Sequence, residues 1–398
     1  MELLVKGSRI VDFSSDFIGD IYIKDGIIES IGKNLIKDCK VIKGEGLALL
    51  PSFIDLHAHF RDPGQVHRED LVSGSRAAVR GGYTGVNLMA NTNPVCSNME
   101  IVSYVKEKID EIGLIDVHQT VSVTNNMDGI DISHLDTLDK RVKFISDDGK
   151  GVINNEIMLL AMQKAGLLGI GIMSHAEYEE LNKYDTRLSE NLMTKRDIEL
   201  LAYANCHLHM AHVSTKEAME EIIQAKIQHK KITCEVTPHH LALINSSYRV
   251  NPPIRSDGDV KFLINAIKYG WVDAIGTDHA PHTIEDKLNG APGISGIETA
   301  FSVCYTKLVV ENNIGLNKLS EIMSRNPAKI LGFNKGQISI GYDGDLVLVD
   351  LNKKYKINAS EFASKGKNTP FDGVECYGEI QMTIKGGKIV YIMPELSS

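Results

Sequence analysis

Eight short apolar runs, spaced along the middle of the chain, constrain its fold more than any other feature. They lie at 53–59, 85–90, 117–123, 142–146, 170–174, 206–212, 232–236 and 274–277. Segments with helical periodicity lie between several of them, at 70–80, 99–111, 154–164, 195–204 and 215–228. Such alternation predicts an α/β protein with a TIM-type (β/α)8 barrel over 51–336. A doubly wound sheet is the alternative, but no G-x-G-x-x-G motif follows an early strand.

One helix start has a recognisable signal. Ser214 is followed three residues later by Glu217, which predicts a capping box opening the helix at 215–228.

The two ends of the chain share a pattern of short strands separated by glycine turns. Strands are predicted at 3–6, 20–24, 27–31, 40–42, 345–350, 380–384 and 388–392. Neither end has enough strands to close a core by itself. Residues 1–50 and 337–398 are therefore predicted to form one small β-sandwich domain together.

Charge and composition exclude several classes of partner. The formal net charge is -9 and no Lys/Arg block is present, which argues against a nucleic-acid partner. No apolar stretch approaches the roughly 20 residues of a membrane span, and no leader pattern opens the chain, so a cytoplasmic protein without a membrane partner is expected. The six cysteines form no C-x-x-C pair, which excludes a thiolate zinc knuckle.

Histidine and aspartate side chains gather where the predicted barrel strands end. His57 and His59 alternate along one strand, so both imidazoles point to the same side and can reach one metal ion. The other strand-end candidates are Asp148, His175, His212 and Asp278. An isolated H-x-H pair is as easily a core feature, but candidates on several strands favour a metal site. Six ligands exceed the needs of one zinc, which predicts two metals with a shared ligand and hydrolysis, or its reverse, as the reaction.

Motifs along essentially the whole chain resemble those of the bacterial class I dihydroorotases. They span 55–64, 89–94, 146–149, 174–177, 212–215, 236–240, 250–255 and 276–282. The resemblance implies a barrel with a composite β-sandwich. It also implies the interconversion of N-carbamoyl-L-aspartate with (S)-dihydroorotate plus water, a step of pyrimidine biosynthesis. A homodimer and a possible association with aspartate transcarbamoylase follow from the same resemblance.

The resemblance also implies a role for each site residue. His57 and His59 would bind one zinc ion and His175 and His212 the other. Asp148 and a hydroxide would bridge the two ions. Asp278 would contact the first zinc and act as the catalytic acid/base. The implied substrate-binding residues are His59, Arg61, Asn91, Asn251, His282, Pro292 and Gly293. His209 is expected to pack or hydrogen-bond, and His279 to orient Asp278.

Arg61 separates the subfamilies. Dihydroorotate carries a ring carboxylate that a guanidinium group binds bidentately, whereas hydantoinases and allantoinases lack arginine at this point. The alternatives are therefore a hydantoinase-like or allantoinase-like hydrolase, and a metal-free homologue that partners aspartate transcarbamoylase.

The chain departs from the family pattern at three points. Ser52 replaces a usual glycine, which is not expected to affect the chemistry. The usual aromatic residue between Pro292 and Gly293 is absent, so the loop over the substrate is expected to change shape. Lys143 lies near the place where other branches have a carboxylated lysine as metal bridge. We favour Asp148, because a free aspartate needs no modification.

Overall fold

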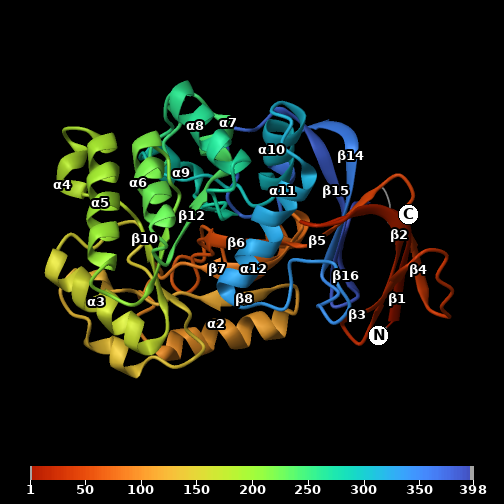
Figure 1. The fold of residues 1–398 in the computed structure, drawn as a ribbon, viewed down its shortest axis with the longest axis horizontal. Helices are drawn as coiled ribbons and strands as arrows, with labels where there is room; N and C mark the ends of the chain where they lie inside the picture. Colours follow the sequence, from red (N-terminus) through yellow and green to blue (C-terminus); the bar gives the residue numbers. More distant parts are fainter. Residues whose placement is uncertain (1, 395–398) are drawn as a thin grey trace.

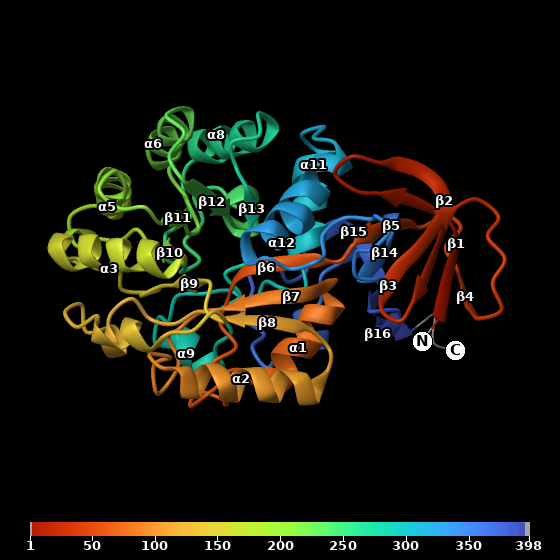
Figure 2. The ribbon, with the colours of Figure 1, turned by 60° about the horizontal axis from the view of Figure 1, so that its bottom comes forward.

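The barrel strands are those that the apolar runs predict. The computed structural model describes residues 2–394. Within that range, parallel sheets of three and five strands form from β6 (Phe53–Ala58), β7 (Tyr83–Leu88), β8 (Asp116–Gln119), β9 (Phe144–Ile145), β10 (Gly171–Ser174), β11 (His207–Met210), β12 (Ile232–Val236) and β13 (Ala274–Ile275). Parallel bridges from Val121 to Ile145 and from Ala58 to His279 join the two sheets into a ring. The predicted (β/α)8 barrel is confirmed, and Figure 2 shows its strands surrounded by helices.

Helices cover the outside of this ring (Figures 1 and 2). They are α1 (Leu71–Arg80), α2 (Met99–Ile112), α3 (Asn155–Leu168), α4 (Glu179–Asn182), α5 (Thr186–Leu201), α6 (Lys216–Ile227), α7 (Pro238–Ala242), α8 (Asp257–Lys268), α9 (Ile284–Leu288), α10 (Ala300–Cys304), α11 (Leu316–Ser320) and α12 (Asn326–Leu331). Short 3-10 turns are η1 (Asn125–Met127), η2 (Ser133–Thr137) and η5 (Ala359–Glu361), and π turns are η3 (Tyr305–Val310) and η4 (Glu321–Arg325). Side-chain caps such as Asp70, which accepts from Ser73 N at 2.7 Å, fix where the helices begin.

Two details of the helix prediction are wrong. Helix α6 is capped by Thr215, whose hydroxyl accepts from Ala218 N at 3.2 Å, while Ser214 donates to the carboxylate of Glu190. The predicted capping box of Ser214 and Glu217 is therefore absent. Helix α5 begins at Thr186, not near 195. The prediction missed its first turns because the buried face of the helix carries polar residues, which hide the helical period.

Strands from both chain ends form one further sheet, at the right of Figure 1. Within residues 2–394 its order is β16-β15-β14-β5-β1-β2-β3, with β4 on β1. The strands are β1 (Glu2–Val11), β2 (Asp16–Lys24), β3 (Ile27–Gly32), β4 (Lys40–Lys43), β5 (Ala48–Pro51), β14 (Leu346–Lys356), β15 (Glu375–Lys385) and β16 (Lys388–Ile392).

The two chain ends meet at β5, a strand that the prediction missed. Leu49 on β5 pairs with Leu348 on β14, and both belong to one apolar cluster with Leu3 and Ile384. The predicted union of the two chain ends in one β unit is therefore confirmed.

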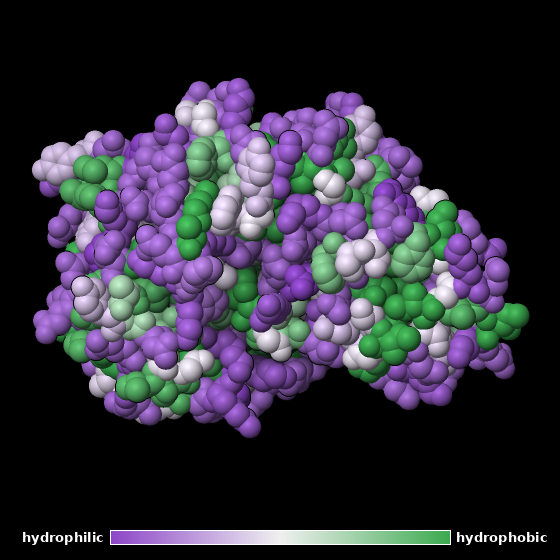
Figure 3. All heavy atoms as spheres, viewed as in Figure 1, coloured by the Kyte–Doolittle hydropathy of each residue, from purple (hydrophilic) through white to green (hydrophobic). Residues whose placement is uncertain are grey.

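On the face shown in Figure 3, the surface over the barrel is mostly polar, and apolar side chains gather over the terminal sheet. Among the described residues, no helix combines the length and apolar character needed to cross a membrane.

Candidate active site

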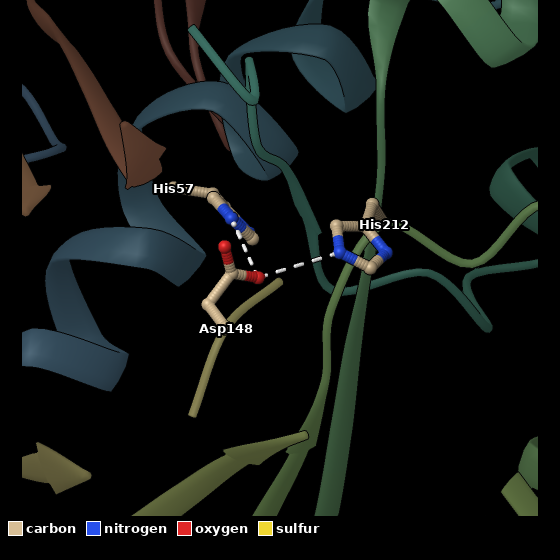
Figure 4. A group of neighbouring side chains, drawn as sticks. All are labelled: His57, Asp148 and His212. Carbon is tan, nitrogen blue, oxygen red and sulfur yellow. Dashed lines mark ion pairs between the residues drawn. The ribbon is translucent and has the colours of Figure 1, made fainter. Parts of the chain in front are cut away.

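A cluster of buried imidazoles and carboxylates occupies the end of the barrel where the strands finish. The Asp148 carboxylate lies at its centre, because Oδ1 is 3.2 Å from His57 Nε2 and 3.5 Å from His212 Nε2 (Figure 4). The same oxygen is 3.2 Å from His175 Nδ1. His57 comes from β6, Asp148 follows β9, and His175 and His212 follow β10 and β11. Residues far apart in the sequence therefore converge on one carboxylate.

Asp278 lies on the His59 side of this cluster. Its Oδ1 is 3.1 Å from His59 Nε2 and 3.8 Å from His57 Nε2, and His59 Nε2 is 3.4 Å from Asp148 Oδ2. Burial alone would raise the pKa of Asp278, but the nearby imidazoles of His59 and His57 lower it below its usual range. Asp278 is therefore ionised at neutral pH and able to accept a proton. All six predicted metal ligands are brought together.

The hydrogen bonds on the outer side of the rings orient the histidines toward this centre. His57 Nδ1 is 2.7 Å from Glu235 Oε1, His59 Nδ1 is 2.8 Å from Asn91 Oδ1, and His175 Nε2 is 2.9 Å from Glu177 Oε2. Because carboxylates and amide oxygens accept, each of these outer nitrogens carries the hydrogen. The lone pair of each inner nitrogen then points into the cluster, which is the arrangement of metal-ligating histidines.

The cluster fits one or more metal ions. Ligand atoms of His57, Asp148 and His212 lie within 4.8 Å of one another, as do those of His57, His59 and Asp278. Donors at 2.0–2.2 Å from a tetrahedral zinc are roughly 3.3–3.6 Å apart. The distances from the histidine nitrogens to Asp148 Oδ1 and Asp278 Oδ1, which range from 3.1 to 3.8 Å, are close to that spacing. Within the described chain, His57 Nε2 and Asp148 Oδ1 are buried without a hydrogen-bond partner, as expected of atoms that bind an ion.

The alternative bridge at Lys143 does not fit this geometry. Lys143 is exposed and directly precedes β9, whereas Asp148 is 4% exposed and contacts four histidines. The geometry therefore favours Asp148.

A pocket opens beside the cluster and collects the predicted substrate residues. Its lining includes His59, Arg61, Asn91, Asn251, His282, Pro292 and Gly293 together with Asp148, His175, His212 and Asp278. His57 lies beneath it and is fully buried. Asn251 donates to Glu177 at 2.9 Å, and Asn91 Nδ2 lies 3.4 Å from Asp148 Oδ2, so both amides also support metal-site residues.

Arg61 is a buried cation in this pocket. Its Nη2 is 3.3 Å from His282 Nε2, and its Nε has no hydrogen-bond partner within residues 2–394. The carboxylates of Asp278, Asp148 and Asp286 act on its charge, but none in that range forms an ion pair with it. Burial and the nearby Arg68 lower the pKa of Arg61 to about 10, so it stays charged at neutral pH. A buried charge without a counterion is costly, and an anionic ligand would remove that cost.

Three of the site residues adopt left-handed backbone conformations. The φ angles are 61° at Arg61, 33° at His212 and 47° at Asp278. Residues other than glycine rarely occupy this region, and such conformations cluster at functional sites. The strained turns aim these three side chains into the pocket from the ends of their strands.

Glu235 is a site residue that the sequence reasoning missed. Besides binding His57, its carboxylate lies 3.3 Å from His209 Nε2 and accepts from His212 N at 3.3 Å. Burial alone would raise the pKa of Glu235, but its contacts with His57 and His209 lower it to about 2. The signal that could have identified Glu235 is its charge, because it is a charged residue inside the apolar run 232–236. His209, expected to pack or hydrogen-bond, is hydrogen-bonded through Nδ1 to Thr233 Oγ1 at 2.8 Å.

Comparisons with known proteins agree with this geometry. The Amidohydrolase family profile matches residues 48–390. A dihydroorotase from Clostridium botulinum is 57% identical over 396 residues, covering 98% of this chain and all of that protein. A dihydroorotase from Ruminiclostridium cellulolyticum is 38% identical, covering 97% of this chain and 98% of that protein. The chain belongs to the dihydroorotase branch of the amidohydrolase family. The resemblance noted from the motifs is confirmed.

Solved structures support the same fold. An L-hydantoinase (dihydropyrimidinase) from Arthrobacter aurescens is 26% identical with a TM-score of 0.89, covering 98% of this chain and 97% of that chain. A dihydropyrimidinase from Brevibacillus agri is 24% identical with a TM-score of 0.89, covering 98% and 95%. The barrel and its terminal sheet are thus shared with enzymes named for other cyclic substrates, so the fold does not choose the substrate.

Proposed function

We propose that this enzyme interconverts (S)-dihydroorotate plus water with N-carbamoyl-L-aspartate, the dihydroorotase step of pyrimidine biosynthesis. One observation carries the choice of substrate: the buried guanidinium of Arg61 faces the pocket, its Nε has no hydrogen-bond partner in the described chain, and the carboxylates of Asp278, Asp148 and Asp286 act on it only from beyond ion-pair distance. The ring carboxylate of dihydroorotate supplies the missing counterion through bidentate hydrogen bonds. A neutral cyclic imide would leave that charge unpaired.

The metal would be a pair of zinc ions. His57 and His59 would hold one ion and His175 and His212 the other, with Asp148 between them. When bound, such a pair supplies Lewis acidity, which acidifies a water molecule and polarises the carbonyl under attack. The inward lone pairs of the histidines and the unpartnered Asp148 Oδ1 support this assignment.

Asp278 would move the proton. Its carboxylate is ionised and lines the pocket, where it would contact both the attacking water and the ring nitrogen that leaves. It would accept a proton from the water and deliver it to that nitrogen, which would otherwise depart as an unstable anion. In the condensing direction the same carboxylate would return the proton, so one residue serves both directions.

Replacing Arg61 by methionine tests the proposal. We expect KM for dihydroorotate to rise about 100-fold or more, because the ring carboxylate loses its partner. Zinc content and thermal midpoint should stay near those of the wild type. The matched control is Arg141→Met. Arg141 is exposed, and within the described chain its ion pair is with nearby Asp139.

A second assay separates the hydantoinase-like alternative. Wild-type enzyme should turn over dihydroorotate and leave dihydrouracil, which lacks the carboxylate, essentially unreacted. Comparable turnover of dihydrouracil would contradict the role given to Arg61. Less than one zinc per purified chain together with no activity would favour a metal-free structural homologue.

Assembly and location remain predictions. We propose a cytoplasmic homodimer that acts on a small molecule, with aspartate transcarbamoylase as a possible partner. Light scattering of the purified chain, alone and mixed with that enzyme, measures both associations.

A further inference from the structure

One side chain from the C-terminal part of the chain packs behind the residues that line the substrate pocket. Asn368 lies in the connection between β14 and β15, far in sequence from the strands that carry the catalytic cluster. Its Oδ1 accepts from His282 N at 2.9 Å and from Ser295 Oγ at 2.8 Å. Its Nδ2 donates to the carbonyls of Ala280 at 3.1 Å and Gly293 at 3.0 Å. Asn368 thus joins the two loops that carry the far wall of the pocket.

Asparagine suits this place because its full hydrogen-bonding capacity is used. The side-chain amide has two N–H donors and an oxygen with two lone pairs, and each meets a partner of the opposite kind. Aspartate has the same shape but no donor at the second position. Its oxygens would face the carbonyls of Ala280 and Gly293, where two acceptors repel each other.

The connection that carries Asn368 is fixed in place independently. Glu69 accepts from the Ser364 hydroxyl, and Glu298 accepts from Ser364 N at 3.0 Å and Ala363 N at 2.9 Å. Gly366 packs so closely that an added Cβ would lie 2.6 Å from Pro281 Cβ. The segment is therefore a rigid support rather than a loose loop.

The loop that Asn368 holds is tightly packed. Gly293 has a φ of 134°, and an added Cβ would lie 2.7 Å from Ala280 Cβ. His282 Nε2 is 2.9 Å from the Pro292 carbonyl and 3.3 Å from Arg61. A shift of this loop therefore moves His282, and with it the wall against which Arg61 lies.

We propose that Asn368 is a positioning residue that sets the affinity for the substrate's ring carboxylate by holding His282 and Gly293 against Arg61. Asn368 does not line the pocket that these residues form. Its effect on the substrate passes through the two loops. This inference rests on the proposed dihydroorotase function, because it assumes that the pocket binds that carboxylate.

The test compares zinc-loaded wild type with Asn368→Asp and Asn368→Ala. We expect KM for dihydroorotate to rise about tenfold or more in Asn368→Asp, with kcat within about threefold and zinc content unchanged. Hydrogen exchange at the amides of 280–295, measured without substrate, should become about tenfold faster, since repulsion between the new carboxylate and the carbonyls of Ala280 and Gly293 releases the loop. Asn368→Ala, which removes the contacts without adding charge, should change both quantities in the same direction.

The control is Asn358→Asp in the same connection. Asn358 is exposed, and its Oδ1 caps η5 by accepting from Ser360 N at 3.2 Å, which aspartate also does. Its Nδ2 donates to Glu361 at 2.6 Å, so Asn358→Asp also replaces a donor that faces an acceptor, but at an exposed place where water screens the repulsion. It should leave both KM and loop exchange unchanged.

The outcomes separate this inference from the proposed function. Unchanged loop exchange in both Asn368 variants would overturn the positioning role. Lower kcat with unchanged KM would indicate a merely structural contribution and would also overturn the inference. If wild type does not process dihydroorotate while loop exchange still responds to Asn368→Asp, the loop-holding role stands and the assignment of the carboxylate falls with the proposed function.

Discussion

Two of the places where this molecule buries charge differ in where the partner comes from. Between the barrel and the terminal sheet, buried Lys335 donates to Asp345 Oδ2 at 2.5 Å and also to Asp116. In the barrel mouth, Arg61 Nε and Asp148 Oδ1 are buried and have no hydrogen-bond partner within residues 2–394. The chain satisfies its own charge in the first place and leaves it open in the second.

The difference follows from what each place contributes. A buried charge that loses its partner costs about 3–5 kcal/mol, so a structural site such as that of Lys335 must be complete. At the barrel mouth an incomplete set is tolerated because a ligand completes it. Substitutions at the mouth should therefore change binding or turnover, whereas those at Lys335 should change stability.

The largest expected effect is at Asp278. In Asp278→Asn the proton acceptor is lost while the shape is kept, so kcat should fall about 1000-fold with dihydroorotate binding and zinc content retained. Steady-state kinetics and calorimetric titration with dihydroorotate measure the two quantities. Turnover near that of the wild type would remove Asp278 from its proposed role.

Lys335→Met sharpens the comparison from the structural side. It leaves Asp345 buried without its cation, so the free energy of unfolding should fall by about 3 kcal/mol, while kcat per folded molecule is unchanged. Urea unfolding provides the measurement, with Lys353→Met, at an exposed position of β14, as the control. A loss of turnover without a loss of stability would break the proposed division between the two places.

Glu235 shares features of both places. Its carboxylate has partners, as that of Asp345 has, but it supports the ligand cluster of the barrel mouth. Glu235→Gln should weaken zinc binding about 10–100-fold, since the His57 ring loses its charged acceptor. Competition with a chelator measures the zinc affinity, and the metal-free protein should unfold at nearly the wild-type temperature. Unchanged zinc affinity would show that Glu235 does not tune the ligand.

The smallest effect concerns two histidines that burial keeps neutral. His118 accepts from Lys143 N at 2.7 Å, and burial, together with Lys143, lowers its pKa to about 3. Burial also lowers the pKa of His207 to about 4. The unfolded chain binds protons on both near pH 6.5 and the folded chain does not, so stability is lost as the pH falls below about 6.5.

Each of these histidines should contribute about 1 kcal/mol of this loss between pH 7.5 and 5.5. Urea unfolding of the metal-free protein across that range measures it. Stability that stays constant or rises on acidification would contradict the neutral state of His118 and His207.

The strand positions could be predicted because periodicity and strand-end residues are local signals. Alternation along 53–59 places His57 and His59 on one side, and the structure brings both rings to Asp148. The same rule located His175, His212 and Asp278, because parallel strands present their C-terminal ends to one mouth. The ligand cluster was therefore readable before its geometry was known.

What the sequence did not reveal depends on contacts between distant segments. Nothing near Asn368 marks it as a neighbour of His282, because the pairing exists only after the C-terminal connection folds against the barrel. Ser214 has a local capping pattern, yet Glu190 on α5 competes for its hydroxyl and Thr215 becomes the cap. Strand β5 is too short to stand out, and its pairing with β14 defines it.

The pairing of β5 with both β1 and β14 has a consequence for biosynthesis. As the chain leaves the ribosome, β1 to β5 emerge first, and β14, which covers the free edge of β5, follows almost 300 residues later. The barrel segment is therefore synthesised while the edge of β5 is still unpaired, and unpaired strand edges promote aggregation. A chain truncated before β14 would keep that edge open, so translation of the last segment protects the first.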